Sequence, residues 1–289
     1  MDIIFQYNSQ LALAGIFALL SAIMLIGMIS KKRIFCSKYL KYTWAFLLIL
    51  LVSKLFSFSY AAIGWAIMSF LTLREYFSLT DLRIQDRVGI LVAYLSIPFM
   101  IYLITIDWYN MFIISIPVYS FLVIPFLISI SGKDFDGAIY SIGTIDFGLF
   151  LFVFCLGHLA YLSYLSCWMA VMLILSVAIC DVIPIVLGKK ITSAKNSYLF
   201  RLLMPMPLTV GLSLMMLNWT NIPMVHSIIL GLMIPALVVI GYHTVRYFEL
   251  DLGIVKEEMK TGEGQIIDNV KTLLYTSPIV FHYIRYFLF

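Results

Sequence analysis

The feature that most constrains this chain is a stretch of about twenty apolar residues that recurs along its length. A helix of that length crosses the roughly 30 Å hydrocarbon layer of a bilayer, and it satisfies its backbone hydrogen bonds internally where lipid offers no partner. Of the 289 residues, 63% are hydrophobic and only 12% are charged, which excludes a soluble globular domain. The sequence therefore predicts an all-α polytopic membrane protein.

The expected spans are placed by hydropathy, and one region needs a second argument. Seven apolar stretches are read as helices: residues 11–30, 88–106, 110–131, 140–165, 167–187, 202–218 and 223–247. Residues 43–73 as one helix would measure roughly 45 Å, which is long for a span. As two short helices they would put Lys54 near a membrane face.

Basic loops give the orientation and help to decide the number of crossings. The two strongest basic segments, residues 31–41 and 189–201, should both face the cytoplasm. An even number of crossings must separate them, and this parity favours two crossings or a re-entrant pair in residues 43–73. We therefore expect about nine transmembrane helices, with the N-terminus outside and a site that faces the cytoplasm.

The C-terminal part of the chain alternates between polar and apolar character. The polar segment 248–271 follows the second basic segment by two spans, so we expect it to face the cytoplasm as well. The tail from residue 272 to residue 289 is apolar but carries a histidine and an arginine. It is predicted either to lie in the membrane interface or to form a final short helix.

The first candidate site is the segment CDVIPIVLGKK at residues 180–190, where an acidic residue ends an apolar helix. Such a residue is expensive in lipid unless it is paired or faces a polar cavity. One interpretation is that Asp181 is a helix-end residue paired with a nearby lysine. The other is a cation or phosphate site, in which Asp181 holds Mg²⁺ and Lys189 or Lys190 meets phosphate oxygens. The spacing leaves both open.

The second candidate is GEGQIIDNVK at residues 262–271, where a glycine-rich turn leads into Asp268 and an apolar helix. Gly262 and Gly264 would let backbone amides approach a phosphate closely, and the carboxylate could hold a metal. A plain turn explains the glycines equally well.

Several stretches, in their order, carry a resemblance to a known family. They are LREYFSL at residues 73–79, DWYNMFIISIPVY at 107–119, VFCLGHLAYL at 153–162, the CDVIPIVLGKK segment, and SPIVFHYIRYF from residue 277. Over roughly residues 60–289 the chain resembles the shorter bacterial branch of the phosphatidate cytidylyltransferase (CDP-diacylglycerol synthase) family. Residues 1–42 would then add a transmembrane helix and basic loop to a cytidylyltransferase-like membrane domain at 43–289.

The resemblance implies that CTP and phosphatidic acid are joined into CDP-diacylglycerol and pyrophosphate at the cytoplasmic face of a bacterial inner membrane, with Mg²⁺ as cofactor. It implies catalytic roles for Asp181, Lys189 and Asp268, metal ligation by Asp181, Asp268 and Glu263, and substrate binding by Lys190, Lys195, Gly262, Gly264 and Lys271. The expected partners are phosphatidic acid, CTP and membrane lipid. No nucleic acid is expected, and a homodimer is left open.

The signature motifs of that family are largely substituted in this chain. After Lys190 the sequence ITSAKNSYLFRLL lacks the family's Trp, Glu and Gly. In the C-terminal signature, Glu263 stands for a histidine, Asn269 for an arginine and Lys271 for the second aspartate. A lysine at a position that faces a metal reverses the local charge and should repel Mg²⁺, whereas Glu263 would offer a replacement carboxylate.

Three functional hypotheses follow from these residues. The first is an active but divergent lipid cytidylyltransferase, which the resemblance and the retained Asp181 and Asp268 favour. The second is a catalytically silent relative that binds lipid or a partner protein, which the substituted signature favours. The third is a small-molecule transporter, which the number of spans allows, although matching pairs of broken helices in two halves are not found in the sequence.

Overall fold

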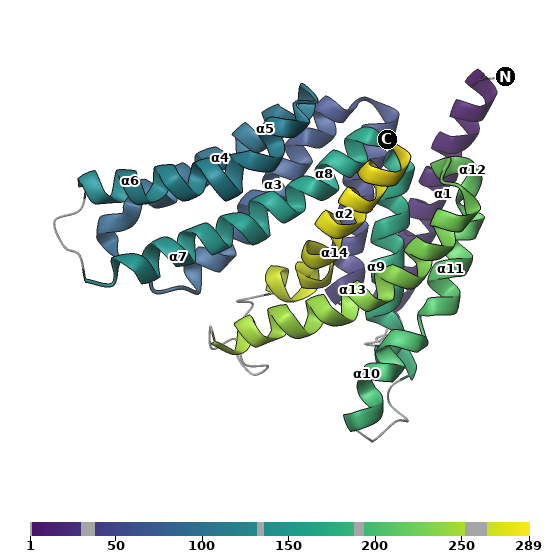
Figure 1. The fold of residues 1–289 in the computed structure, drawn as a ribbon. Helices are drawn as coiled ribbons and strands as arrows, with labels where there is room; N and C mark the ends of the chain where they lie inside the picture. The colour runs from purple at the N-terminus through teal and green to yellow at the C-terminus, as the bar shows by residue number, and fades with distance from the viewer. Residues whose placement is uncertain (1, 30–37, 132–135, 188–193, 252–264) are drawn as a thin grey trace.

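The fold is drawn in Figure 1 from a computed structural model that describes residues 2–29, 38–131, 136–187, 194–251 and 265–289. Within these ranges every regular element is a helix. The first half contains α1 (Asp2–Ile29), α2 (Lys38–Leu55), α3 (Phe58–Ser78), η1 (Ile84–Asp86), α4 (Arg87–Thr105), α5 (Tyr109–Ile114), η2 (Ser115–Ser120) and α6 (Phe121–Ser131). The second half contains α7 (Ala138–Leu149), η3 (Phe150–Cys155), α8 (Leu156–Leu165), α9 (Cys167–Leu187), α10 (Ala194–Leu203), α11 (Met206–Met215), α12 (Leu217–Thr220), α13 (Met224–Asp251) and α14 (Gln265–Leu288).

Long apolar helices dominate the described part of the chain. Seven segments there are long and apolar enough to cross a membrane: Asn8–Ile26, Ile84–Thr105, Tyr109–Ile130, Ala138–Leu165, Cys167–Pro184, Tyr198–Met215 and Met224–Phe248. Two of these spans continue through a short π-helical turn, η2 or η3, that joins two α-helices. The prediction of an all-α polytopic membrane protein is confirmed, whereas the total of nine spans stays a prediction.

Residues 43–73 form two helices, as the parity of the basic loops favoured. α2 ends at Leu55 and α3 begins at Phe58, so the break falls just after Lys54, which lies in the last turn of α2. The two helices pack closely, because a Cβ added to Gly64 in α3 would lie 2.8 Å from the Cγ1 atom of Ile49 in α2. A single helix over this region is thereby ruled out.

The tail forms a final helix, as one of the two expectations had it, but this helix is long and lies in the interior. α14 contains 24 residues and would measure about 36 Å, and it packs against α13, α8, α2 and α9. Its polar residues are buried because they bond inside the protein: the Thr276 hydroxyl donates to the Thr272 carbonyl at 3.0 Å, and the Ser277 hydroxyl to the Leu273 carbonyl at 2.6 Å. Hydropathy alone therefore underestimates how deeply this helix is placed.

Close contact with α13 fixes the position of α14. A Cβ added to Gly241 would lie 2.6 Å from the Cβ atom of Tyr275, so only glycine allows the two backbones to approach this far. Figure 1 shows α13 and α14 running together between α3–α8 on one side and α1, α9 and α11 on the other. Side chains from both sides can therefore meet along α14.

Candidate functional site

A charged cluster lies at the N-terminal end of α14. Asp268 and Lys271 are one helical turn apart, and the Lys271 ammonium donates to the Asp268 carboxylate with a separation of 2.5 Å. The Lys271 side chain is only 1% exposed, while that of Asp268 is 14% exposed. A buried ammonium needs such a partner, because an isolated charge is costly to remove from water.

Asp181 in α9 joins this cluster. The Thr272 hydroxyl of α14 donates to the Asp181 carboxylate at 2.9 Å. The same carboxylate interacts electrostatically with Lys271, Arg201 and Asp268. The fold therefore brings the two sequence motifs to one place, although Asp181 and Asp268 are 87 residues apart in the sequence.

Tyr242 of α13 supports two cations at this place. The Lys271 ammonium lies 4.9 Å from the centre of the Tyr242 ring, and the Arg201 guanidinium of α10 lies 4.4 Å from it. The negative face of an aromatic ring attracts cations, so Tyr242 lowers the cost of holding two positive charges near each other. We call Asp181, Arg201, Tyr242, Asp268, Lys271 and Thr272 the inner cluster.

Glu75 of α3 occupies the N-terminus of α14. One of its carboxylate oxygens, Oε2, accepts hydrogen bonds from the backbone amides of Ile266 and Ile267, each at 2.9 Å. The first amides of a helix have no internal partner and favour an anion, which here is a side chain of the protein itself. These two amides are consequently engaged by Glu75.

The comparisons with known proteins leave the family open. No family model matches the chain, and no solved structure matches it. The chain is similar to the uncharacterized protein YnbB of Escherichia coli (strain K12), with 23% identity over 241 residues, which cover 77% of this chain and 78% of YnbB. The functional argument therefore depends on the geometry of the site.

The structure describes only some of the predicted site residues. Asp181, Asp268 and Lys271 come together in the inner cluster. Lys195 lies in the first turn of α10, and its side chain is outside the described part. The others lie outside the described residues altogether: Lys189, Lys190, Gly262, Glu263 and Gly264.

Sequence reasoning missed three members of the inner cluster and Glu75, which binds the first amides of α14 beside it. Arg201 belongs to a basic segment that the sequence did single out for orientation, so its charge was a usable signal. Thr272 follows Lys271 directly, yet a threonine in an apolar helix carries no signal of its own. Tyr242 and Glu75 reach the cluster only through the packing of α13 and α3 against α14, which no local pattern reports.

The described residues do not fit a Mg²⁺ site. They contain no group of three His, Cys, Asp or Glu side chains placed to hold a metal ion. Of the two carboxylates near each other, Asp268 is ion-paired with Lys271 and Asp181 is bonded to Thr272. Mg²⁺ demands several oxygen ligands in near-octahedral geometry, and a buried ammonium at this position opposes it.

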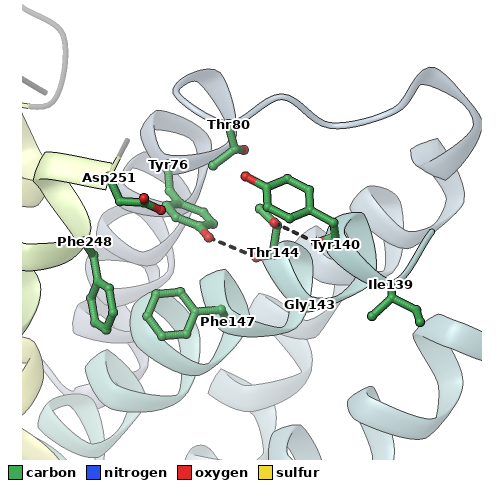
Figure 2. Close-up of a pocket in the computed structure, with 9 residues that line it drawn as sticks. All are labelled: Tyr76, Thr80, Ile139, Tyr140, Gly143, Thr144, Phe147, Phe248 and Asp251. Carbon is green, nitrogen blue, oxygen red and sulfur yellow. Dashed lines mark hydrogen bonds between the residues drawn. The ribbon is translucent and has the colours of Figure 1, made fainter. Parts of the chain in front are cut away.

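The structure contains a small cavity at α14 and a wider groove between neighbouring helices. A cavity of about 20 Å³ between α2, α9 and α14 reaches Asp181, and it is large enough for about one water molecule. A wider groove of about 390 Å³ is lined by α3, α7 and α13 (Figure 2). Its side chains are mainly aromatic, with polar atoms at Tyr76, Thr80, Tyr140 and Asp251.

The groove is held in shape by its own contacts. The Tyr76 hydroxyl donates to the Thr144 carbonyl at 3.1 Å, and the Thr144 hydroxyl donates to the Tyr140 carbonyl at 2.8 Å, as Figure 2 shows. Gly148 leaves room for Tyr76, because a Cβ there would lie 2.6 Å from the tyrosine ring. Tyr76 directly follows Glu75 in α3, but Glu75 itself does not line the groove. An aromatic groove with a polar rim suits a lipid better than a free nucleotide.

Proposed function

We propose that the chain binds phosphatidic acid and CTP at the inner cluster and joins them into CDP-diacylglycerol and pyrophosphate, as the phosphatidate cytidylyltransferases do. The observation that carries this proposal is the meeting of Asp181 with Asp268 and Lys271. Those residues come from the two candidate segments that the sequence singles out, and the first of them is also one of the stretches that carry the family resemblance. We further propose that the protein works in the inner membrane of a bacterium, with this cluster toward the cytoplasm.

The chemistry that the cluster would support is charge neutralisation. An oxygen of the lipid phosphate attacks the α-phosphorus of CTP, a new P–O bond forms, and the bond to the departing pyrophosphate breaks. Negative charge develops on phosphate oxygens, and the fixed cations Lys271 and Arg201 can stabilise it electrostatically. Tyr242 and Asp268 hold these cations in place before the substrates bind.

The groove of Figure 2 supports a lipid as one substrate. Its aromatic side chains, such as Phe147 and Phe248, would contact acyl chains, while Thr80 and Asp251 would remain near the head group.

One observation favours a second candidate, a catalytically silent relative that binds phosphatidic acid. Both carboxylates of the cluster are already engaged within the protein, and the described residues do not supply a metal site. In that case Lys271 and Arg201 would hold the lipid phosphate without transferring a nucleotide to it.

The experiment that tests the proposal measures pyrophosphate release by purified protein in detergent, with phosphatidic acid and CTP, in the presence and absence of Mg²⁺. Asp181→Asn and Lys271→Gln are compared with Asp81→Asn, an exposed acid outside the cluster. Release that both cluster variants abolish and Asp81→Asn retains supports the transferase.

A binding assay with vesicles of phosphatidic acid or phosphatidylcholine separates the alternatives. Folded protein that releases no pyrophosphate but prefers phosphatidic acid, and loses this preference in Lys271→Gln, favours the silent relative. Both candidates would be overturned by folded protein that releases no pyrophosphate and shows no preference for phosphatidic acid.

A further inference from the structure

A second polar cluster lies at the other end of α14. Arg285 follows Asp268 by 17 residues, or roughly 26 Å of helix, which approaches the thickness of the hydrocarbon layer. Figure 1 places this end of α14 at the mark C, away from the start of the helix. The residues that meet here are Tyr109 of α5, His158 of α8 and His282 and Arg285 of α14.

Hydrogen bonds give the two histidines fixed roles. His158 is fully buried, and its Nδ1 atom lies 2.7 Å from the Phe154 carbonyl, to which it must donate because a carbonyl only accepts. In the neutral ring the Nε2 atom of His158 then accepts from Nε2 of His282, at 3.2 Å. The Nδ1 atom of His282 is left to accept from the Tyr109 hydroxyl at 3.5 Å. In this arrangement the two histidines link α8, α14 and Tyr109 by hydrogen bonds.

Arg285 is the cation of this cluster. Its guanidinium lies over the Tyr109 ring, 4.8 Å from the centre, and it forms no ion pair with any described residue. The nearby carboxylate of Asp107 is engaged by the Tyr161 hydroxyl at 2.5 Å. A guanidinium that stacks by its face keeps its N–H edges available for an acceptor.

These side chains open onto a pocket. It has a volume of about 570 Å³ and is lined by Tyr109, His282, Arg285, Tyr286 and Phe289, none of which is acidic. Tyr286 is 82% exposed and Phe289 64% exposed. Exposed aromatic residues near a helix end are typical of the head-group level of a membrane. The pocket therefore combines an arginine that has no ion-pair partner among the described residues with exposed aromatic side chains of the kind found at the level of lipid phosphates.

We propose that this pocket binds the phosphate of an anionic lipid in the leaflet opposite the inner cluster. The Arg285 N–H groups donate to phosphate oxygens, the Tyr286 hydroxyl adds a donor at the rim, and Phe289 contacts the lipid chain. Tyr109 and the histidine pair hold Arg285 and the wall of the pocket in position. This site is separate from the proposed reaction, and either can fail without the other.

The test uses the full chain in detergent and counts bound lipids by native mass spectrometry. Phosphatidylglycerol is compared with phosphatidylcholine for wild type, for Arg285→Gln and for the matched control Arg74→Gln, an exposed arginine near the opposite end of the bundle. We expect wild type and the control to prefer phosphatidylglycerol, and Arg285→Gln to bind it roughly tenfold more weakly, as the loss of one charge-assisted contact predicts. Arg285→Lys should keep part of the preference.

Two outcomes would overturn the proposal. One is equal binding of phosphatidylglycerol by wild type and Arg285→Gln. The other is an Arg285-dependent response to inorganic phosphate alone without any to the lipid, which would exclude a lipid ligand. If Arg285→Gln fails to fold, Tyr286→Phe replaces it, because this exposed hydroxyl can be removed without disturbing packing. An unchanged lipid preference in Tyr286→Phe would then count against the assignment.

Discussion

The two ends of α14 hold charge in opposite ways. At the inner end the cations Lys271 and Arg201 share one tyrosine ring and face the carboxylates of Asp181 and Asp268, so positive and negative charge balance inside the protein. At the outer end Arg285 also lies over a tyrosine ring, but it forms no ion pair with a described residue. The comparison teaches that the same cation–aromatic contact serves a self-contained network at one end and an open anion site at the other.

The largest effect should come from breaking the balance at the inner end. Lys271→Met removes one partner of a buried ion pair and leaves Asp268 and Asp181 without their ammonium neighbour. We expect the free energy of unfolding to fall by about 3–5 kcal/mol, measured by reversible unfolding in mixed micelles. Combining it with Asp268→Asn removes both charges of the pair and should restore most of this loss.

Arg285→Gln is the counterpart at the outer end. Its guanidinium has no ion-pair partner among the described residues, so the variant should cost less than about 1 kcal/mol. If Lys271→Met and Arg285→Gln lower the free energy of unfolding by the same amount, the proposed difference between the two ends is wrong.

The next effect concerns the bond between α14 and α9. Thr272→Val keeps the shape of the side chain but removes the hydroxyl that donates to Asp181 at 2.9 Å. A hydrogen bond to a charged group contributes about 1.5–3 kcal/mol, and we expect a loss of that size in the free energy of unfolding.

Thr276→Val is the matched control for this change. Its hydroxyl is buried one turn later in α14 but bonds only backbone carbonyls of its own helix. Thr276→Val should lower the free energy of unfolding by less than about 1 kcal/mol. Equal losses in Thr272→Val and Thr276→Val would mean that the bond to Asp181 contributes no more than an ordinary helical hydroxyl contact.

A backbone change can separate the two ends. Gly241→Ala would place a Cβ 2.6 Å from that of Tyr275 and push α13 away from α14. We expect a loss of about 1–3 kcal/mol in unfolding free energy and weaker phosphatidic acid binding at the inner cluster, because Tyr242 moves with α13. Lipid binding at Arg285 should persist.

The control for that change is Gly211→Ala in α11, where a Cβ would have no atom within 4 Å. It should leave both stability and lipid binding as they are in wild type. A loss of binding at both ends in Gly241→Ala would show that the two clusters are not independent.

The membrane class could be predicted from the sequence because it depends on local composition, but the depth of α14 could not. Its Thr272, Thr276 and Ser277 lower the hydropathy, although each hydroxyl is satisfied within the fold and buried. Hydropathy measures transfer of isolated residues to lipid, whereas these residues are transferred into protein. Arg285, which the sequence reads as a mark of an interfacial or short tail, lies in the last turn of a 24-residue helix that packs through the bundle.

The inner cluster was predictable only in part, for a related reason. The motifs contain Asp181, Asp268 and Lys271, and the charge reversal at Lys271 was visible in the sequence. That Lys271 would pair with the neighbouring Asp268 follows from their i, i+3 spacing in a helix. The contribution of Tyr242 depends on how closely α13 approaches α14, which is a property of packing and of Gly241.

The smallest effect sharpens the outer end, where the ring and the hydroxyl of Tyr109 have different tasks. Tyr109→Phe keeps the ring beneath Arg285 and removes only a hydrogen bond that is already long at 3.5 Å, so we expect a cost of about 0.5 kcal/mol and normal phosphatidylglycerol binding. Tyr109→Leu removes the ring as well and should weaken that binding about threefold, because a cation–aromatic contact contributes roughly 0.5–1 kcal/mol. Weaker phosphatidylglycerol binding in Tyr109→Phe would instead assign the effect to the hydrogen bonds of His282 and His158, because the Tyr109 hydroxyl donates to His282. In that case the aromatic ring would matter less for lipid binding than the hydrogen bonds that orient it.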